Sequence, residues 1–150
     1  MIRPATAEDI LDFAPKMREA DKEEVEAIIG LDPLAALSIG LFQSDQCCIG
    51  INPEGEVVGV FGVVPIVPNQ IGSVWFLSSD AITRSARHVV REAREWLDEQ
   101  NATYPILTNV VTDANTVHKR LLRSLGFTFG TPIENYGTGR VRVIPFERYP

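Results

Sequence analysis

The chain has 150 residues, 45% of them hydrophobic and 23% charged, and its formal net charge at pH 7 is −6. This length fits one compact domain over residues 1–150, long enough to bury most of the surface that the unfolded chain exposes. The acidic balance disfavours an overall basic nucleic-acid binder and a protein held on a membrane by polybasic attraction. The most apolar run, VVGVFGVVPIV at 57–67, is too short to cross a bilayer, and the opening MIRPATAEDI has no apolar signal core. We therefore expect a soluble protein of the cytoplasm.

The residues that most readily bind transition metals are Cys47, Cys48, His88 and His118, and their spacing matches no metal motif. Adjacent cysteines form a strained and rare disulfide, so we expect two reduced thiols. Cys47 has no histidine–acid partner near it in the sequence, and a strand thiol beside Ile49 is usually buried and inert. The sequence predicts neither a metal site nor a cysteine nucleophile.

The first third of the chain predicts three helices. The first covers about 7–17 and ends or kinks near Pro15, because proline lacks the N–H that a helix interior needs. The second begins with Asp21 as its N-cap and ends at Gly30. The third begins with Asp32 as cap and Pro33 in the first helical position.

The remainder predicts strands alternating with two helices. Val-rich and alternating runs separated by turn residues indicate strands, and apolar residues at helical spacing indicate amphipathic helices. The expected strands are 46–52, 56–64, 73–77, 105–111, 127–133 and 140–146, with a turn at 53–55, and the expected helices are 84–99 and 115–125. This order predicts an α/β (α+β) fold with a mixed central sheet, flanking helices and a central strand–helix–strand crossover.

Two features of the expected strands concern packing. Trp75 and Phe76 are neighbours, so on a strand their side chains face opposite sides of the sheet. Gly59 and Gly62 lie in a Val-rich strand, where glycine marks either a bulge or the close approach of another backbone.

The last predicted helix carries a family resemblance. The run NTVHKRLLRSLGF, together with the element order and the opening IRPATAEDI, resembles the GNAT fold of acyl-CoA-dependent N-acetyltransferases. Their last core helix often reads Asn, six residues, Leu-Tyr, two residues, Leu-Gly-Phe. Leu122 stands where the tyrosine is expected. The matching residues are Asn115, Leu121, Leu125, Gly126 and Phe127.

A narrower resemblance covers about residues 28–129. Successive blocks, including GLDPLAALSIGLFQSDQCCIGI, VVGVFGVVP, VWFLSSDAI and REAREWLDE, are similar to the internal virion protein A family of short-tailed bacteriophages, whose members have a GNAT-like fold. This resemblance implies a role in phage particle assembly, with other virion proteins as partners. It also implies a location in the host cytoplasm during assembly, and in the virion if the particle retains the protein.

The resemblance also implies where an acyl-CoA would bind. GNAT enzymes carry a turn of the type Arg-x-x-Gly-x-Gly whose main-chain N–H groups meet the pyrophosphate of CoA, assisted by the helix N-terminus. The equivalent stretch here runs from Arg84 to Val89, with Arg87 and Val89 in the glycine positions, and a β-branched valine is bulky and stiff there. The expected vestigial CoA site comprises Arg84, Ser85, Arg87, His88 and Asn115, although Asn115 also fits a helix cap.

Acetyl transfer to an amine needs a general base and a general acid. The GNAT resemblance implies a tyrosine as the acid, and Leu122 cannot donate a proton. His118, one turn earlier, is a weak substitute, because a histidine in VHKRLL is more typical of a surface. Glu56 or Asp113 could act as base, and nothing in the sequence distinguishes them.

Because the glycine turn and the phenol are both absent, we expect a catalytically degenerate domain that needs no cofactor. The alternative is an active N-acetyltransferase that uses acetyl-CoA to modify an amine of a small molecule or protein. It would need the side chains of Arg84 and Arg87 in place of glycine main chain.

Two basic faces remain to be explained. Arg84, Arg87, Arg91 and Arg94 recur at helical spacing, and Glu95 is placed to pair with Arg91. This row indicates either a solvated, salt-bridged face or a site for phosphate or an acidic partner. The HKRLLR run at 118–123 gives a second basic face, and both would contact other virion proteins. A DNA-packaging role is disfavoured by the net charge.

Overall fold

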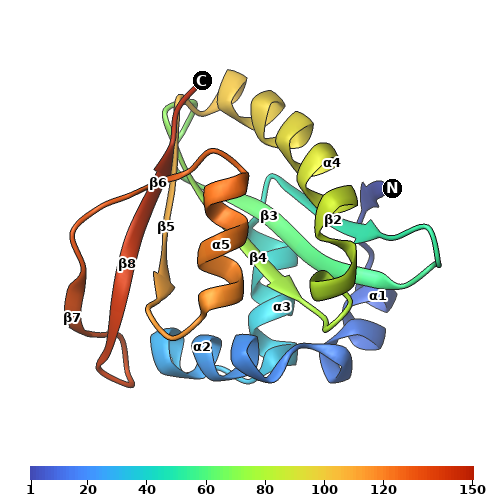
Figure 1. Cartoon of the computed structure of the whole chain (residues 1–150), viewed down its shortest axis with the longest axis horizontal. Helices are drawn as coiled ribbons and strands as arrows, with labels where there is room; N and C mark the ends of the chain where they lie inside the picture. The colour runs from blue at the N-terminus through green and yellow to red at the C-terminus, as the bar shows by residue number, and fades with distance from the viewer.

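The computed structural model describes all 150 residues as an eight-stranded sheet with helices on both faces (Figure 1). Helices α4 and α5 cover one face of the sheet, and α1, α2 and α3 cover the other, with α2 running along one end (Figure 1). This is the mixed sheet with flanking helices that the sequence predicts. In chain order the elements are β1 (Ile2–Pro4), α1 (Ala7–Phe13), a 3₁₀ turn (Ala14–Lys16), α2 (Glu19–Ile29), α3 (Pro33–Gln43), β2 (Gln46–Ile51), β3 (Val57–Val67), β4 (Ile71–Ser78), α4 (Ile82–Thr103), β5 (Ile106–Thr112), α5 (Thr116–Ser124), β6 (Thr128–Phe129), β7 (Ile133–Tyr136) and β8 (Val141–Arg148).

The strand order is β1-β2-β3-β4-β5-β8-β6, and β7 also pairs with β8. Every pairing is antiparallel except that of β4 with β5, which are joined through α4. The β4–β5 ladder is short, because only Ile71–Ser73 pair with Ile106–Thr108. Beyond these residues the two strands run on without pairing, so the sheet opens between them.

The N-terminal helices differ from the prediction in one informative place. The first helix has the Thr6–Asp9 capping box and ends at Phe13, followed by the 3₁₀ turn that contains Pro15. The cap at Asp32 is confirmed. The predicted N-cap at Asp21 is wrong, because α2 begins at Glu19 and Asp21 lies fully buried inside it. Tertiary hydrogen bonds to β4 use the Asp21 carboxylate instead, so tertiary structure overrides the local capping preference.

Strands β3 and β4 and helix α4 are longer than expected, and the strand expected at 127–133 is instead two short strands, β6 and β7. Strand β3 continues through Pro65 to Val67, and a register irregularity between these two residues accommodates the missing proline N–H. Helix α4 begins two residues before the predicted start at 84 and extends to Thr103. Its apolar stripe packs on the sheet as predicted, with Trp96 and Leu97 in the core. No single helix is long and apolar enough to cross a membrane, and the α2–α3 pair meets that test only with a bend of 71°.

The core divides into two layers, one on each face of the sheet. Phe76 packs in the layer under α4 and α5, and Trp75 packs in the layer under α1–α3, which confirms that they face opposite sides. Gly59 and Gly62 both mark a close approach of backbone, because a Cβ would lie 2.9 Å from Leu77 O on Gly59 and 2.7 Å from Gln46 O on Gly62. A Cβ on Gly59 would lie 2.5 Å from the Phe76 ring, and one on Gly62 would lie 3.0 Å from the Trp75 indole nitrogen. Gly59 also lies at a register irregularity, since Gly50 pairs with Gly59 but Ile51 pairs with Val57.

The turn between β7 and β8 holds the C-terminal end of α2. Gly139 N donates to Ala27 O at 2.7 Å, and Thr138 N donates to Ile28 O at 3.4 Å. These bonds satisfy carbonyl groups that a helix leaves unpaired at its C-terminus. The turn therefore fixes α2 across the end of the sheet where β4 and β5 separate (Figure 1).

Candidate functional site

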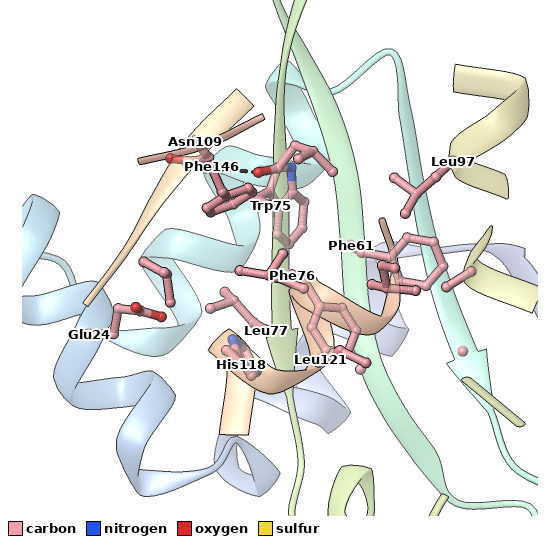
Figure 2. Close-up of a pocket in the computed structure, with 18 of the residues that line it drawn as sticks. Glu24, Phe61, Trp75, Phe76, Leu77, Leu97, Asn109, His118, Leu121 and Phe146 are labelled. Atoms are coloured by element: carbon pink, nitrogen blue, oxygen red, sulfur yellow. Dashed lines mark hydrogen bonds between the residues drawn. The ribbon is translucent and has the colours of Figure 1, made fainter. Parts of the chain in front are cut away.

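The opening between β4 and β5 contains a cavity of about 310 Å³. Its walls come from both core layers, because the unpaired strands leave a passage through the sheet. Asn109 Nδ2 donates to Val74 O at 2.8 Å and links the strands just beyond the last ladder pair. Figure 2 shows Trp75, Phe76 and Leu121 among the lining side chains, with Glu24 and His118. The cavity is largely apolar, and Glu24 and His118 lie at the end away from Asn109 (Figure 2).

A buried polar cluster closes that end. Asp21 and Ser78 are 0% exposed and His118 is 5% exposed. Asp21 Oδ2 accepts hydrogen bonds from the Ser78 main-chain N–H and from Ser78 Oγ, both at 2.7 Å. His118 Nε2 lies 2.9 Å from Ser78 Oγ and 3.3 Å from Asp21 Oδ2. Helix α2, the end of β4 and helix α5 therefore meet at one carboxylate.

Two further side chains complete the cluster on the other carboxylate oxygen. Arg18 donates to Asp21 Oδ1 at 2.9 Å, and Asn115 Nδ2 donates to it at 3.2 Å. Asn115 also donates to Glu24 Oε2, and Glu24 Oε1 accepts from the N–H and hydroxyl of Thr112. The cluster thus ties α2 to the C-terminal ends of both separated strands.

Burial would raise the pKa of Asp21, but hydrogen bonds from His118 and from the N–H and hydroxyl of Ser78 outweigh it and bring the pKa below the ordinary aspartate value. Asp21 is therefore ionised at neutral pH. In a serine–histidine–aspartate nucleophile the acid holds the histidine nitrogen that the serine does not use. Here Asp21 and Ser78 share Nε2, and Ser78 Oγ donates to Asp21, so the geometry does not activate the hydroxyl.

The carboxylates of Asp21 and Glu24 and a nitrogen of His118 lie within 4.8 Å of one another, a separation that a metal ion can bridge. The Arg18 guanidinium, however, lies 2.9 Å from Asp21. Both acids already accept several hydrogen bonds. A cation would have to displace these donors and lie beside a positive charge, so the arrangement favours a hydrogen-bonded cluster over an ion site.

The junction between β4 and α4 is a three-residue turn, Ser79–Ala81, and no glycine occurs between Gly72 and Gly126. Every main-chain N–H from Ser78 to Ser85 except that of Asp80 donates a hydrogen bond within the chain. The acceptors are Asp21 Oδ2 for Ser78, Val58 O for Ser79, Ser79 Oγ for Ala81, Ser79 O for Ile82, Asp80 O for Thr83, and Ala81 O for Arg84 and Ser85. A pyrophosphate would have to break these bonds to reach the main chain.

The residues predicted for a vestigial CoA site lie on α4 and at the start of α5. Arg84 is exposed, and its guanidinium pairs with Glu56 at 2.7 Å. Ser85 is buried, and its hydroxyl accepts a hydrogen bond from Asn52 in the β2–β3 connection. Arg87 and His88 are exposed on the second turn of α4. Arg84, Arg87 and His88 share one exposed face of the helix, whereas Ser85 points inward, so the four side chains do not form a common pocket.

The other two sequence candidates, Asn115 and His118, belong to the buried cluster. Asn115 caps α5 by accepting from His118 N, as expected, and its amide also binds Asp21 and Glu24. The expectation that His118 lies on the surface is wrong. The first turn of α5 presses it against Phe76, with ring centroids 5.3 Å apart, and the imidazole fills the end of the cavity.

Neither predicted base is free of ion pairs. Glu56 binds Arg84 and the Asn52 amide. Asp113 binds Lys119 at 2.8 Å, and this hydrogen bond lowers the pKa of Asp113 and so weakens it as a base.

No phenol replaces Leu122 in the cavity. Tyr104 lies beside Gly72 at the paired end of β4, where its hydroxyl donates to Asp45. That hydrogen bond, with burial, raises the pKa of Tyr104 to about 12. Burial likewise raises the pKa of Cys47 to about 12, in keeping with an inert thiol.

Sequence reasoning missed Asp21, Ser78 and Arg18. A signal for Asp21 was present, since it precedes Val25 by four residues and Ile28 by seven and so lies in the apolar row of α2. An acid in such a row must find buried partners. Ser78 could not be identified locally, because it lies 57 residues from Asp21 on β4, whereas Arg18, three residues before Asp21 at the N-cap of α2, was within reach of a local i,i+3 pairing.

Comparison with known proteins identifies one family. The family described as "Bacteriophage T7, probable scaffold protein Gp13" matches residues 48–132, more than half of the chain. This segment includes β3, β4, α4, β5 and α5, and so it contains both separated strands. No curated protein matches the chain.

Solved structures with the same fold are N-acetyltransferases. A GCN5-related N-acetyltransferase from Kribbella flavida has a TM-score of 0.72 at 21% identity, covering 100% of this chain and 97% of that one. A GNAT superfamily phosphinothricin acetyltransferase from Sinorhizobium meliloti, in complex with acetyl-CoA, has a TM-score of 0.74 at 17% identity, covering 99% and 87%. A ribosomal-protein-alanine N-acetyltransferase from Brucella melitensis has a TM-score of 0.66 at 19% identity, covering 100% and 99%. At these identities the likeness shows the GNAT fold and nothing more.

Proposed function

Because the chain belongs to the phage family described as "Bacteriophage T7, probable scaffold protein Gp13" and has the GNAT fold, we propose that it is a catalytically degenerate GNAT domain that acts in virion assembly through protein–protein contacts. Assembly of the internal core or head takes place in the host cytoplasm, which is where we place its action. If the phage particle retains the protein, the virion is a second location. Its partners are other virion proteins.

The observation that carries the loss of catalysis is the hydrogen bonding of the β4–α4 junction. The N–H groups that would have to meet a pyrophosphate bind acceptors of the chain itself, and the last N–H of β4 binds the buried Asp21. An ionised carboxylate at that point also opposes an anionic ligand. Leu122 supplies no proton donor, and the available acids are ion-paired. Acyl-CoA binding and proton transfer are thus disfavoured by separate features.

Titration of the purified full chain with acetyl-CoA will test this directly. We expect no heat of binding at micromolar ligand, because a bound pyrophosphate would gain few main-chain hydrogen bonds while disrupting existing ones. An active GNAT enzyme titrated in the same buffer serves as the control. Saturable binding with a micromolar dissociation constant would show that the site is intact.

The assembly role is tested on the surface of α5. Arg120 is exposed and forms no ion pair in the chain, whereas Lys119 binds Asp113 and Arg123 lies over the Phe129 ring. We expect Arg120→Glu to lower the yield of infectious particles several-fold when the variant gene complements a phage that lacks it. Arg140→Glu, an equal charge change at an exposed arginine outside α4 and α5, should leave the yield unchanged. Equal yields for both variants would exclude this face as a partner surface.

A second candidate function rests on the placement of His118. The imidazole lines the cavity and contacts the ionised Asp21, an arrangement that can hold and orient a proton. In that case the protein is an N-acetyltransferase that uses acetyl-CoA on an amine, with His118 as the proton-transfer group. A thiol-release assay with small amines and peptides distinguishes the two functions. Turnover that His118→Gln abolishes, without loss of folding, would favour the enzyme.

A further inference from the structure

The outer face of α4 carries four charged residues at successive spacings of four, Arg87, Arg91, Glu95 and Glu99. Residues four apart on a helix are surface neighbours, so these side chains form one continuous row, hereafter the α4 row. All four are exposed. None of them forms an ion pair within the chain, and the expected Arg91–Glu95 pair is absent, which corrects that prediction.

The stability of α4 itself does not explain this order of charges. A helix dipole favours acids toward the N-terminus and bases toward the C-terminus, and the α4 row has the reverse order. An acid four residues before a base is also the better orientation for an intrahelical pair, and here the arginines come first. The four charges are thus placed against the preferences of an isolated helix, and no ion pair within the chain compensates for this. Such an arrangement indicates a partner molecule.

The row has a simple symmetry. Arg91 and Glu95 are each two residues from Ala93, and Arg87 and Glu99 are each six residues from it. If a second α4 lies antiparallel against the outer face, with the two helices level at Ala93 along their axes, every arginine of the row faces a glutamate. The pairs are Arg91 with the second copy's Glu95, Arg87 with its Glu99, and the two reciprocal pairs. A two-fold axis produces this self-complementary contact.

We propose that the α4 row is a self-association surface, on which two copies of this chain pair through antiparallel α4 helices. The presence of both signs, two arginines followed by two glutamates, selects the occupant. A nucleic acid or a purely acidic segment would match the arginines but meet the two glutamates, whereas a second copy matches all four residues. This inference does not depend on the proposed loss of catalysis, and it leaves the α5 face open to other virion proteins.

The expected strength follows from the size of the contact. Helix α4 has 22 residues. At 1.5 Å per residue it is roughly 33 Å long, and at about 10 Å wide its outer face covers on the order of 300 Å² per copy. A stable interface buries about 1,200–2,000 Å² in total, and an exposed ion pair contributes about 0.2–1 kcal/mol. The dimer should therefore be weak, sensitive to salt and favoured where the protein is concentrated.

Sedimentation velocity of the full chain tests the pairing. The protein concentration is raised to about 1 mM, and each series is measured at about 0.02 M and about 0.5 M salt. We expect concentration-dependent dimers at low salt that dissociate at high salt. The variant Arg87→Glu with Arg91→Glu makes the row entirely acidic, and Glu95→Arg with Glu99→Arg makes it entirely basic. Each variant should remain monomeric alone, and an equimolar mixture of the two should form heterodimers.

The control is Arg120→Glu with Arg140→Glu, which makes the same change in net charge as the acidic variant, but away from α4, and should associate like the wild type. Circular dichroism confirms that each variant folds, which is expected because all substituted side chains are exposed. A wild-type chain that stays monomeric at low salt would overturn the proposal. So would single-sign variants that still self-associate, or a mixture that forms no heterodimer.

Discussion

Replacing Asp21 by alanine should lower the free energy of unfolding by about 3–5 kcal/mol, the usual cost of removing one partner from a buried ion pair. The variant leaves the Arg18 guanidinium without its carboxylate and the N–H and hydroxyl of Ser78 without their acceptor. Because this carboxylate joins α2 to β4 and α5, its loss should also loosen α2. Denaturant unfolding followed by circular dichroism measures the change.

The matched control is Glu23→Ala, an exposed acid on the same helix, which should change stability by no more than about 0.5 kcal/mol. If Asp21→Ala does not fold, Asp21→Asn keeps the shape of the side chain and permits the same measurement. Equal stabilities for the Asp21 and Glu23 variants would show that the cluster does not hold α2.

The same carboxylate predicts a dependence on pH. The pKa of Asp21 is lower in the folded chain than its ordinary value of about 3.9. The stability that ionised Asp21 contributes is therefore complete above that value and is lost as the pH falls through the folded-state pKa. We expect the wild type to lose stability more steeply than Asp21→Asn below about pH 4. Asp113 contributes to the pH dependence of stability in both proteins, because its pKa is also lowered.

Gly137→Ala should destabilise the fold by about 2–4 kcal/mol, through backbone strain and overpacking together. Gly137 has a φ of 72°, in the left-handed region, and a Cβ built on it would lie 2.6 Å from Ile28 O and 2.8 Å from Ala27 O. Those carbonyls belong to the end of α2 and cannot move without breaking the contact between the β7–β8 turn and the helix. Thermal or denaturant unfolding checks the value.

Gly55→Ala isolates the contribution of backbone strain. Gly55 has a φ of 83°, but a Cβ added to it would have no atom within 4 Å. Its substitution should destabilise the fold by only about 1–2 kcal/mol, the usual cost of a left-handed alanine. Similar losses for the two variants would mean that the β7–β8 turn is not packed against α2 as described.

Much of the fold could be predicted because its signals are local. The turn at 53–55, the Asp32 cap and the apolar stripe of α4 each depend on residues close together in sequence, and the structure confirms them. The opposite orientation of Trp75 and Phe76 follows from the two-residue period of a strand. The residues of the LGF run end α5 at Gly126, whose φ of 89° suits glycine.

The candidate site was less predictable, because its partners are distant in sequence. His118 and Asp21 were interpreted as a surface residue and a helix cap, the ordinary roles of such residues in polar local sequence. In the structure they share one buried cluster with Ser78, between elements that are far apart in the chain. The resemblance also aligned the CoA-binding turn with Arg84–Val89, at the start of the expected helix, whereas these residues lie inside α4, which begins at Ile82.

The sequence by itself determined the element order, the two-sided sheet and the absence of a glycine turn and of a phenol at Leu122. These properties depend on residue type and on spacing along one element. Only the tertiary structure decided how the β4–α4 N–H groups are used and that His118, in contact with the buried Asp21, lines the cavity. The reason is that a buried polar group must be satisfied by whichever partners the fold brings near it, and the strand order, not the local sequence, selects those partners.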